Sequence, residues 1–167
     1  MQHFGKKVIY KGNSFDSVKE RDFFIHFIEN CSKHYEVHPR YQVLGKFPVG
    51  GYNMRGVSYT PDFVVYNGTD ILHVYDVKTS LSPRAIDSAA KIRFTLFARK
   101  YGIPVEVVVP RKNNFKMKIY GLPSIQTAHE KHDRHGNVKT TAKGNPTYDH
   151  YDVFSSIDYN IHDIIGK

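Results

Sequence analysis

Apolar residues recur along this chain at two spacings, one typical of helices and one typical of strands. Between about residues 17 and 34 they return every three or four positions, which predicts a helix with one buried stripe. The residues of this stripe are Phe23, Phe24, Phe27, Ile28 and Cys31. Asp16 or Ser17 is placed to cap this helix, and Glu20 follows at the spacing of a capping box.

Strands are expected where short runs of apolar residues are bounded by turn residues. These runs cover about residues 7–10, 41–44, 61–66, 71–78, 105–109 and 115–120. Asn67 and Gly68 lie between two of the runs and are the strongest two-residue signal for a β-hairpin. A second helix is expected from about 83 to 100, with Ser82 as its cap and Gly102 at its end.

The character of the sequence changes at about residue 122. The segment 122–150 is polar, rich in His, Lys, Gly and Thr, and has no periodicity, so we expect a loop or arm that is mobile without a ligand. Residues 151–167 regain apolar positions, which favour a short helix that docks on the core. A chain of 167 residues is long enough for one domain with a hydrophobic core and an appended arm.

Composition and charge narrow the class of protein. The formal net charge of +8 favours a polyanionic partner, because lysine and arginine at phosphates release condensed counterions. No apolar run approaches the ~18 residues of a membrane helix, and no signal peptide is evident near the N-terminus. The single cysteine cannot form an internal disulfide. We therefore expect a soluble intracellular protein.

Charged residues interrupt two of the predicted strands at related places. Asp62 follows Pro61 at the head of one strand, and Asp76 and Lys78 lie at the tail of the next. Residues two apart in a strand share a face, so Asp76 and Lys78 project together. A hairpin about Asn67-Gly68 places Asp62 opposite Val74 or Tyr75, within a residue or two of Asp76. Glu20 lies one helical turn before the apolar stripe and is expected to lean over the same point.

Three carboxylates around one point repel one another and cannot all be ionised without a cation. Mg²⁺ or Mn²⁺, which prefer oxygen ligands and keep several waters, suit such a site. A metal there polarises a phosphate and lowers the pKa of an attacking water. Lys78 is placed to orient or deprotonate that water, or to neutralise charge on the phosphate. Phosphodiester hydrolysis is the chemistry that this combination favours.

A glutamate in the first helix, then Pro-Asp, a hairpin, Asp-x-Lys and a basic helix follow in an order that resembles the PD-(D/E)xK nuclease superfamily. Over about residues 5–120 the chain is similar to small phage-type endonucleases, to Holliday-junction resolvases and to the nuclease subunit of heteromeric transposons. The resemblance implies a fold of the α/β (α+β) class, a mixed β-sheet flanked by helices with a restriction-endonuclease-like core, over residues 1–121. It also implies that Glu20, Asp62, Asp76 and the Val77 carbonyl are metal ligands. Lys78 would be the catalytic lysine.

The function expected from this resemblance is a Mg²⁺-dependent DNA endonuclease in which Mn²⁺ can substitute. Its expected substrate is branched or junction DNA, and two symmetric cuts favour a homodimer. A phage protein of this kind would act in a bacterial host's cytoplasm, in recombination or DNA packaging. Three alternatives stay open: a catalytically silent DNA-binding module of the same fold, a sequence-specific restriction-type nuclease, and a structural protein that binds RNA.

Five basic residues are candidates for DNA contacts. They are Arg55 in the Gly-rich loop 45–56, Lys91 and Arg93 on the second helix, and Lys131 and Arg134 in the segment 122–150. A solvated surface is an equally good interpretation of the basic residues on the second helix. The histidines at 129, 132 and 135 favour a polar loop over a zinc site, because no cysteine accompanies them and no helix holds them on one face.

Overall fold

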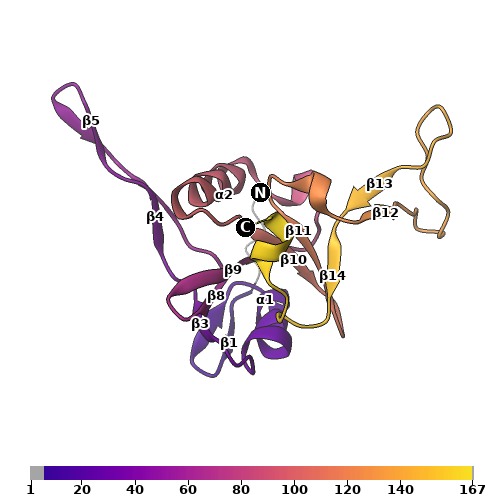
Figure 1. Cartoon of the computed structure of the whole chain (residues 1–167), viewed down its shortest axis with the longest axis horizontal. Coiled ribbons are helices and arrows are strands. Elements are labelled where there is room, and N and C mark those ends of the chain that lie inside the picture. Colours follow the sequence, from indigo (N-terminus) through magenta and orange to yellow (C-terminus); the bar gives the residue numbers. More distant parts are fainter. Residues whose placement is uncertain (1–5, 167) are drawn as a thin grey trace.

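A six-stranded mixed β-sheet forms the centre of the molecule in the computed structural model, which describes residues 6–166 (Figure 1). The strands in spatial order are β14 (Asp152–Phe154), β11 (Phe115–Ile119), β10 (Glu106–Pro110), β9 (Asp70–Val77), β8 (Phe63–Asn67) and β3 (His34–Val37). Only β9 and β10 pair in parallel, and the other neighbours are antiparallel. The predicted α+β class with a mixed sheet is confirmed. The edge strand β14 comes from the C-terminal segment.

The predicted hairpin about Asn67-Gly68 is confirmed. Strands β8 and β9 pair with Phe63 opposite Tyr75 and Asn67 opposite Asp70. Gly68 has a φ of +65°, a left-handed conformation that glycine adopts without steric cost. The register shifts by one residue next to Val65, where a bulge interrupts the ladder. The N-terminal strand prediction is also confirmed, since β1 (Val8–Tyr10) pairs with β2 (Asn13–Phe15), a strand not predicted from the sequence.

One face of the sheet is covered by the first helix, which is shorter than predicted. Helix α1 (Val18–Phe23) continues into a π-helical turn (Phe24–Ile28). Phe23 packs against Phe63 and Phe115 of the sheet, with ring centroids 5.8 and 5.1 Å away. The prediction of a helix to residue 34 is wrong, because His34 already pairs with Tyr66 of β8 as part of β3. Ladder hydrogen bonds to the sheet replace the last helical turns.

The opposite face is covered by α2 (Ser88–Tyr101), which connects the parallel strands β9 and β10. The predicted start at 83 with Ser82 as cap is wrong. Residues Pro83–Ala85 form a separate 3-10 turn, and the carboxylate of Asp87 caps α2 by accepting from the Ala90 N–H at 2.8 Å. Gly102 ends the helix in the left-handed conformation, as predicted.

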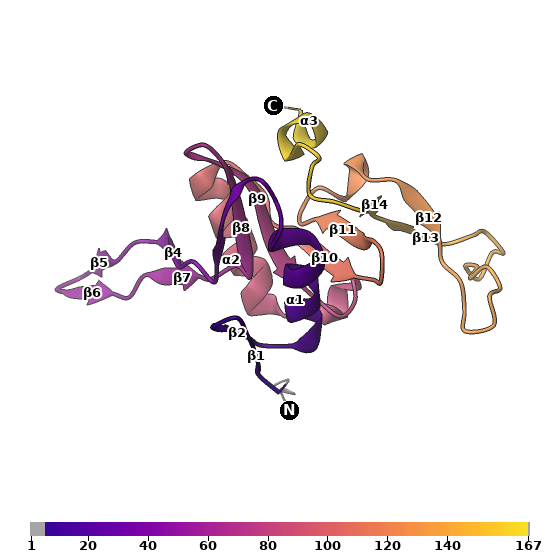
Figure 2. The same ribbon diagram turned by 90° about the horizontal axis from the view of Figure 1, so that it is seen from below.

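Two β-arms project from opposite sides of this body, as the two views of the ribbon agree (Figures 1 and 2). The first arm consists of β4 (Tyr41–Leu44) with β7 (Val57–Tyr59), and β5 (Phe47–Val49) with β6 (Tyr52–Met54). The predicted loop 45–56 is therefore mostly a β-ribbon. Lys100 and Tyr101 of α2 hold its base, since both donate to the Gln42 carbonyl, at 2.6 and 3.0 Å.

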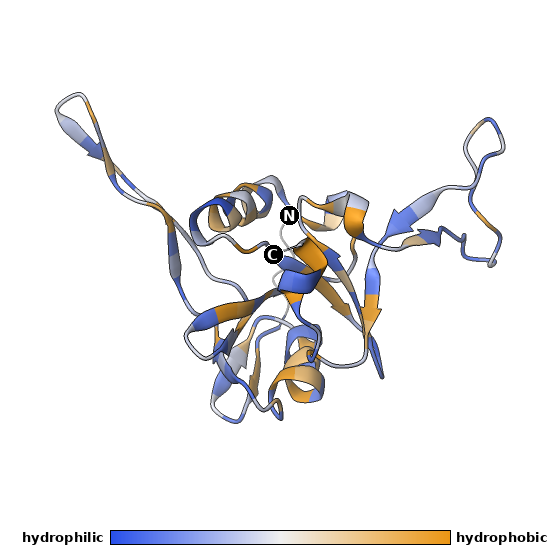
Figure 3. Ribbon diagram, viewed as in Figure 1, coloured by the Kyte–Doolittle hydropathy of each residue, from blue (hydrophilic) through white to orange (hydrophobic). Residues whose placement is uncertain are grey.

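The second arm lies within residues 122–150. Strands β12 (Ala128–Glu130) and β13 (Tyr148–His150) pair antiparallel, and beyond them the arm divides into two small hairpins, closed by bridges from His132 to Val138 and from Thr140 to Pro146. The prediction of a segment without regular structure is wrong here, because backbone pairing needs no alternation of apolar residues. Most of this arm is coloured hydrophilic in Figure 3, in contrast to the apolar central strands.

The C-terminal segment returns to the body. Ile157 and Ile161 are buried in the core, and Ile161 begins the short helix α3 (Ile161–Ile165). Within residues 6–166, no helix is long and apolar enough to cross a membrane.

Candidate metal centre

The side chains of Glu20, His38 and Asp62 meet at one end of the sheet. One ligand atom from each residue lies within 4.8 Å of the other two. Glu20 is positioned by the start of α1, where Ser17 accepts from its N–H at 3.1 Å and its own carboxylate accepts from the Asp16 N–H at 2.9 Å. This capping arrangement aims a buried carboxylate toward the sheet, since the Glu20 residue is only 3% exposed.

Asp62 is held at the start of β8 by the neighbouring strand. Its N–H donates to the Tyr75 carbonyl at 3.0 Å, and its Oδ2 accepts from the Val77 N–H at 2.6 Å. Burial, followed by the charges of Asp76 and Glu20, raises the pKa of Asp62 well above its usual value. The expected proximity of Asp62 to Asp76 is therefore confirmed. A metal-ligand role for the Val77 carbonyl stays a prediction.

Asp76 and Lys78 project from the end of β9 onto the face covered by α2. The Asp76 carboxylate forms an ion pair with the Lys78 ammonium and accepts from the buried Tyr59 hydroxyl at 3.0 Å. Burial opposes the charge on Lys78, but the attraction and the hydrogen bond of Asp76 outweigh it and raise the pKa of Lys78. Burial likewise raises the pKa of Tyr59, which keeps its hydroxyl a donor.

These groups line an open cleft of about 510 Å³. Asp62, Asp76 and Lys78 line it, and Arg40 and Arg93 add positive charge to the same lining. The donor set fits a hard divalent cation, because carboxylate oxygens converge from two elements and the crowding of negative charge raises one carboxyl pKa. Glu20 and Asp62 are the carboxylates of this cluster that would hold Mg²⁺ or Mn²⁺, and a ligand role for Asp76, which lies beside Asp62, stays a prediction.

His38 is a member of this cluster that sequence reasoning missed. It follows the last residue of β3 with a φ of +53°, a strained conformation for a residue other than glycine. Its N–H donates to the Asp62 carbonyl at 3.0 Å, and its Nε2 lies 2.5 Å from Glu20 Oε1. The hydrogen bond to Glu20 raises the pKa of His38, against the effect of burial. No local signal around residue 38 identifies it, because only the pairing of β3 with β8 brings it to Asp62.

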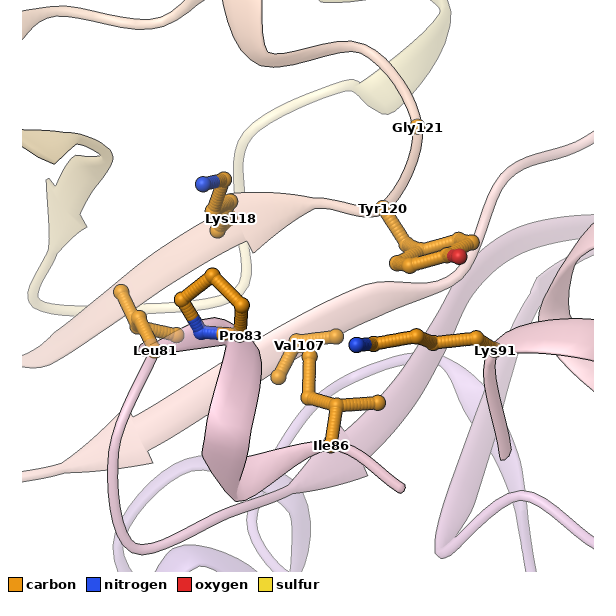
Figure 4. A pocket seen from close by; sticks show the side chains of 8 residues that line it. All are labelled: Leu81, Pro83, Ile86, Lys91, Val107, Lys118, Tyr120 and Gly121. Atoms are coloured by element: carbon orange, nitrogen blue, oxygen red, sulfur yellow. The ribbon is translucent and has the colours of Figure 1, made fainter. Parts of the chain in front are cut away.

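The five predicted DNA-contact residues lie at different places. Arg93 lines the cleft, but Lys91, two positions earlier on α2, lines a separate pocket of about 210 Å³. In Figure 4 the Lys91 side chain extends between Ile86 and Tyr120 in that pocket. The two residues line different pockets because residues two apart on a helix do not share a face, and a DNA contact by either stays a prediction.

The other three candidates are on the arms. Arg55 lies between β6 and β7. Tyr59, the last residue of β7, lines the cleft. Lys131 and Arg134 are on the second arm, where Lys131 pairs with Asp149 at 3.2 Å and Arg134 donates to His135 at 3.0 Å. None of these three lines the cleft.

A family model described as "Protein of unknown function (DUF1064)" matches residues 1–113. The chain belongs to the DUF1064 family. The DUF1064 match includes every residue of the candidate metal centre and ends shortly after β10, so the second arm lies outside it. No curated protein and no solved structure matches the chain.

Proposed function

We propose that this protein is a metal-dependent DNA endonuclease of the PD-(D/E)xK type. The observation that carries the proposal is the convergence of Glu20, Asp62 and Asp76 with one lysine, Lys78, at the end of a hairpin. Glu20 is on α1, Asp62 directly precedes β8, Asp76 is near the end of β9 and Lys78 directly follows it. Asp62, Asp76 and Lys78 line an open cleft. A buried acidic cluster with a lysine suits the binding of a cation and a phosphate better than it suits folding, since it costs stability without a ligand.

Each residue has a role in phosphodiester hydrolysis. The bound divalent cation would supply charge for the phosphate oxygens and acidity for the attacking water. Glu20, Asp62 and Asp76 hold the cation, and the Tyr59 hydroxyl fixes the orientation of Asp76. Lys78 places its positive charge beside this cluster, where it attracts the scissile phosphate and orients the water.

In this reaction the water oxygen forms a bond to phosphorus while the bond from phosphorus to the leaving ester oxygen breaks. The water loses a proton to solvent, and the leaving oxygen takes up a proton. Arg40 and Arg93, which line the cleft walls, are placed to hold the phosphates beside the scissile one.

The substrate and the oligomeric state are proposed from the resemblance to Holliday-junction resolvases. Branched DNA of the Holliday-junction type is the expected substrate, and paired cuts in it require two active sites, which a homodimer supplies. A bacterial host's cytoplasm is the compartment in which such a protein would meet its DNA. A four-way junction that shifts the sedimentation of the protein to that of a dimer–DNA complex would support this assignment.

The test is cleavage of a four-way junction, a fork, a linear duplex and a single strand, each with Mg²⁺, with Mn²⁺ and with EDTA. We expect metal-dependent cutting that Asp76→Ala abolishes. Asp70→Ala is the matched control, because Asp70 is an exposed aspartate at the other end of β9. Cutting of all duplexes alike would remove the junction preference. Tight binding without any cutting would replace the enzyme by a DNA-binding module of the same fold.

A further inference from the structure

A second cleft lies between the sheet and the second arm. It encloses about 460 Å³, and its lining includes four basic side chains and one acidic side chain. The basic residues are Arg111, Lys116, Lys131 and Lys139, and the acidic residue is Asp149. Thr79 and Ser80, which directly follow the proposed catalytic Lys78, form part of the same lining. The cleft is therefore strongly basic and begins where the metal centre ends.

The strand register connects this cleft to the metal centre. Asp76 lies beside Val107 and Val77 beside Val108 in the parallel ladder, and the Lys78 N–H donates to the Val108 carbonyl at 2.9 Å. The next step of this ladder brings Lys78 level with Val109. Val109 in turn pairs with Lys116 on β11.

Residues in register across neighbouring strands share a face, so Lys78 and Lys116 point to the same side of the sheet. Two strand spacings separate them, which corresponds to about 10 Å. The phosphates of one DNA strand advance about 3.4 Å along the helix axis per nucleotide. This rise is only the axial part of the spacing between phosphates, so about 10 Å spans at most about three nucleotides, and Lys116 is within reach of a phosphate close to one bound at Lys78.

The arm contributes the other wall of the cleft. Beyond its two strands the arm is tied together at Lys131 and Lys139, where the Lys139 N–H donates to the Lys131 carbonyl at 2.8 Å. The side chain of Lys131 pairs with Asp149, whereas that of Lys139 is exposed on the ribbon. Lys116 lies over the ring of Tyr151 with its Nζ 4.4 Å from the centroid, which fixes the direction of its charge.

We propose that this cleft binds the phosphodiester backbone of DNA on one side of the scissile phosphate. The second arm closes over that backbone from the side away from the sheet. Four basic side chains against one acidic side chain fit a chain of phosphates, whereas a single small anion would need fewer of them. The position of the cleft along the DNA rests on the proposed nuclease function, but its affinity for DNA does not.

The test is the salt dependence of DNA binding in EDTA, where no cutting occurs. Fluorescence anisotropy with a labelled duplex would compare the wild type with Lys116→Ala/Lys139→Ala. Each lost phosphate contact lowers the slope of log K against log salt by about 0.9, so the double variant should lose about 1.8. The ratio of the two dissociation constants then changes about 60-fold over a tenfold range of salt.

The matched control is Lys112→Ala/Lys143→Ala, which removes the same charge from exposed lysines that do not line the cleft. It should leave the slope close to that of the wild type. Lys139→Ala alone should lose half the slope change of the double variant, which guards against a folding defect from the lost contact of Lys116 with Tyr151. Equal slopes in the double variant and the wild type would overturn the inference, and so would equal losses in the two double variants.

The outcome is separable from the proposed function. If the wild type cuts no DNA in Mg²⁺ or Mn²⁺ but the cleft variant still loses its salt slope, the nuclease assignment fails and the cleft stands. If the wild type cuts and the cleft variant binds DNA as the wild type does, the nuclease assignment stands and the inference about the cleft fails.

Discussion

Replacing Asp62 by asparagine should make the protein more stable without metal and insensitive to metal. Asparagine has nearly the shape of aspartate, and its side-chain oxygen can still accept from the Val77 N–H, which lies 2.6 Å from Asp62 Oδ2. The substitution therefore removes a charge and keeps the packing. The removed charge lies in a cluster with the buried Glu20 and with Asp76, both of which raise the pKa of Asp62.

The size of the effect follows from the distances. Two unit charges 4.8 Å apart, the limit that encloses the cluster of Glu20, His38 and Asp62, repel by about 3 kcal/mol at an effective dielectric constant of about 20. His38 contacts Glu20 at the same point, and this hydrogen bond, which raises the pKa of His38, offsets part of the repulsion. A net gain of about 1–2 kcal/mol corresponds to about 2–8 °C in the melting temperature of a protein of this size.

The sign of the pH dependence follows from the raised pKa of Asp62. The folded state holds this proton more tightly than the unfolded chain does, so the wild type loses stability as the pH rises above the unfolded value of about 3.9. The advantage of Asp62→Asn should be present at pH 7 and vanish below about pH 4.

Thermal melts in EDTA and in Mn²⁺ test both the gain in stability without metal and the loss of the response to metal. The wild type should gain about 2.7 kcal/mol when Mn²⁺ is present at about 100 times its dissociation constant, and the variant should gain little. Asp70→Asn, at the exposed end of β9, is the matched control and should melt as the wild type does in both buffers. A variant that melts below the wild type in EDTA and keeps the full shift with Mn²⁺ would refute the reasoning.

Three further predictions concern single contacts. Tyr59→Phe removes the hydroxyl that donates to the Asp76 carboxylate. A hydrogen bond to a charged group contributes about 1.5–3 kcal/mol, so DNA cleavage should slow about tenfold or more in a rate assay and the melting temperature should fall by about 3–12 °C. Glu106→Ala removes the carboxylate 2.9 Å from the buried His73, one of the two hydrogen-bond partners of this ring. It should cost about 3–5 kcal/mol in chemical denaturation, with the Mn²⁺ shift of the melting temperature retained. Gly56→Ala would place a Cβ 2.4 Å from the main-chain oxygen of Leu44 on the facing strand and should destabilise the first arm by about 1–3 kcal/mol. Hydrogen exchange of the arm's amides measures this loss. Gly51→Ala, whose Cβ meets open space, should leave the exchange of these amides unchanged.

Local signals in the sequence were sufficient for the parts of the fold that depend on neighbouring residues. Asn67-Gly68 determines a hairpin because few residue pairs adopt its turn, and that hairpin places Asp62 beside Asp76. The alternation of side chains along a strand puts Asp76 and Lys78 on one face whatever the rest of the fold does. Ser17 and Glu20 likewise determine the start of the first helix through contacts within four residues.

Contacts between distant segments decided the rest. His38 reaches Asp62 only because β3 pairs with β8, and the same pairing ends the first helix early. Asp87 rather than the predicted Ser82 caps α2, because a separate 3-10 turn and the buried Ile86 precede the helix. The second arm is held by backbone hydrogen bonds, which leave no pattern of apolar side chains in the sequence. The sequence alone thus identified the carboxylates and the lysine of the candidate site. His38 joins the metal cluster, and the basic cleft forms beside it, only because the sheet brings distant strands into register.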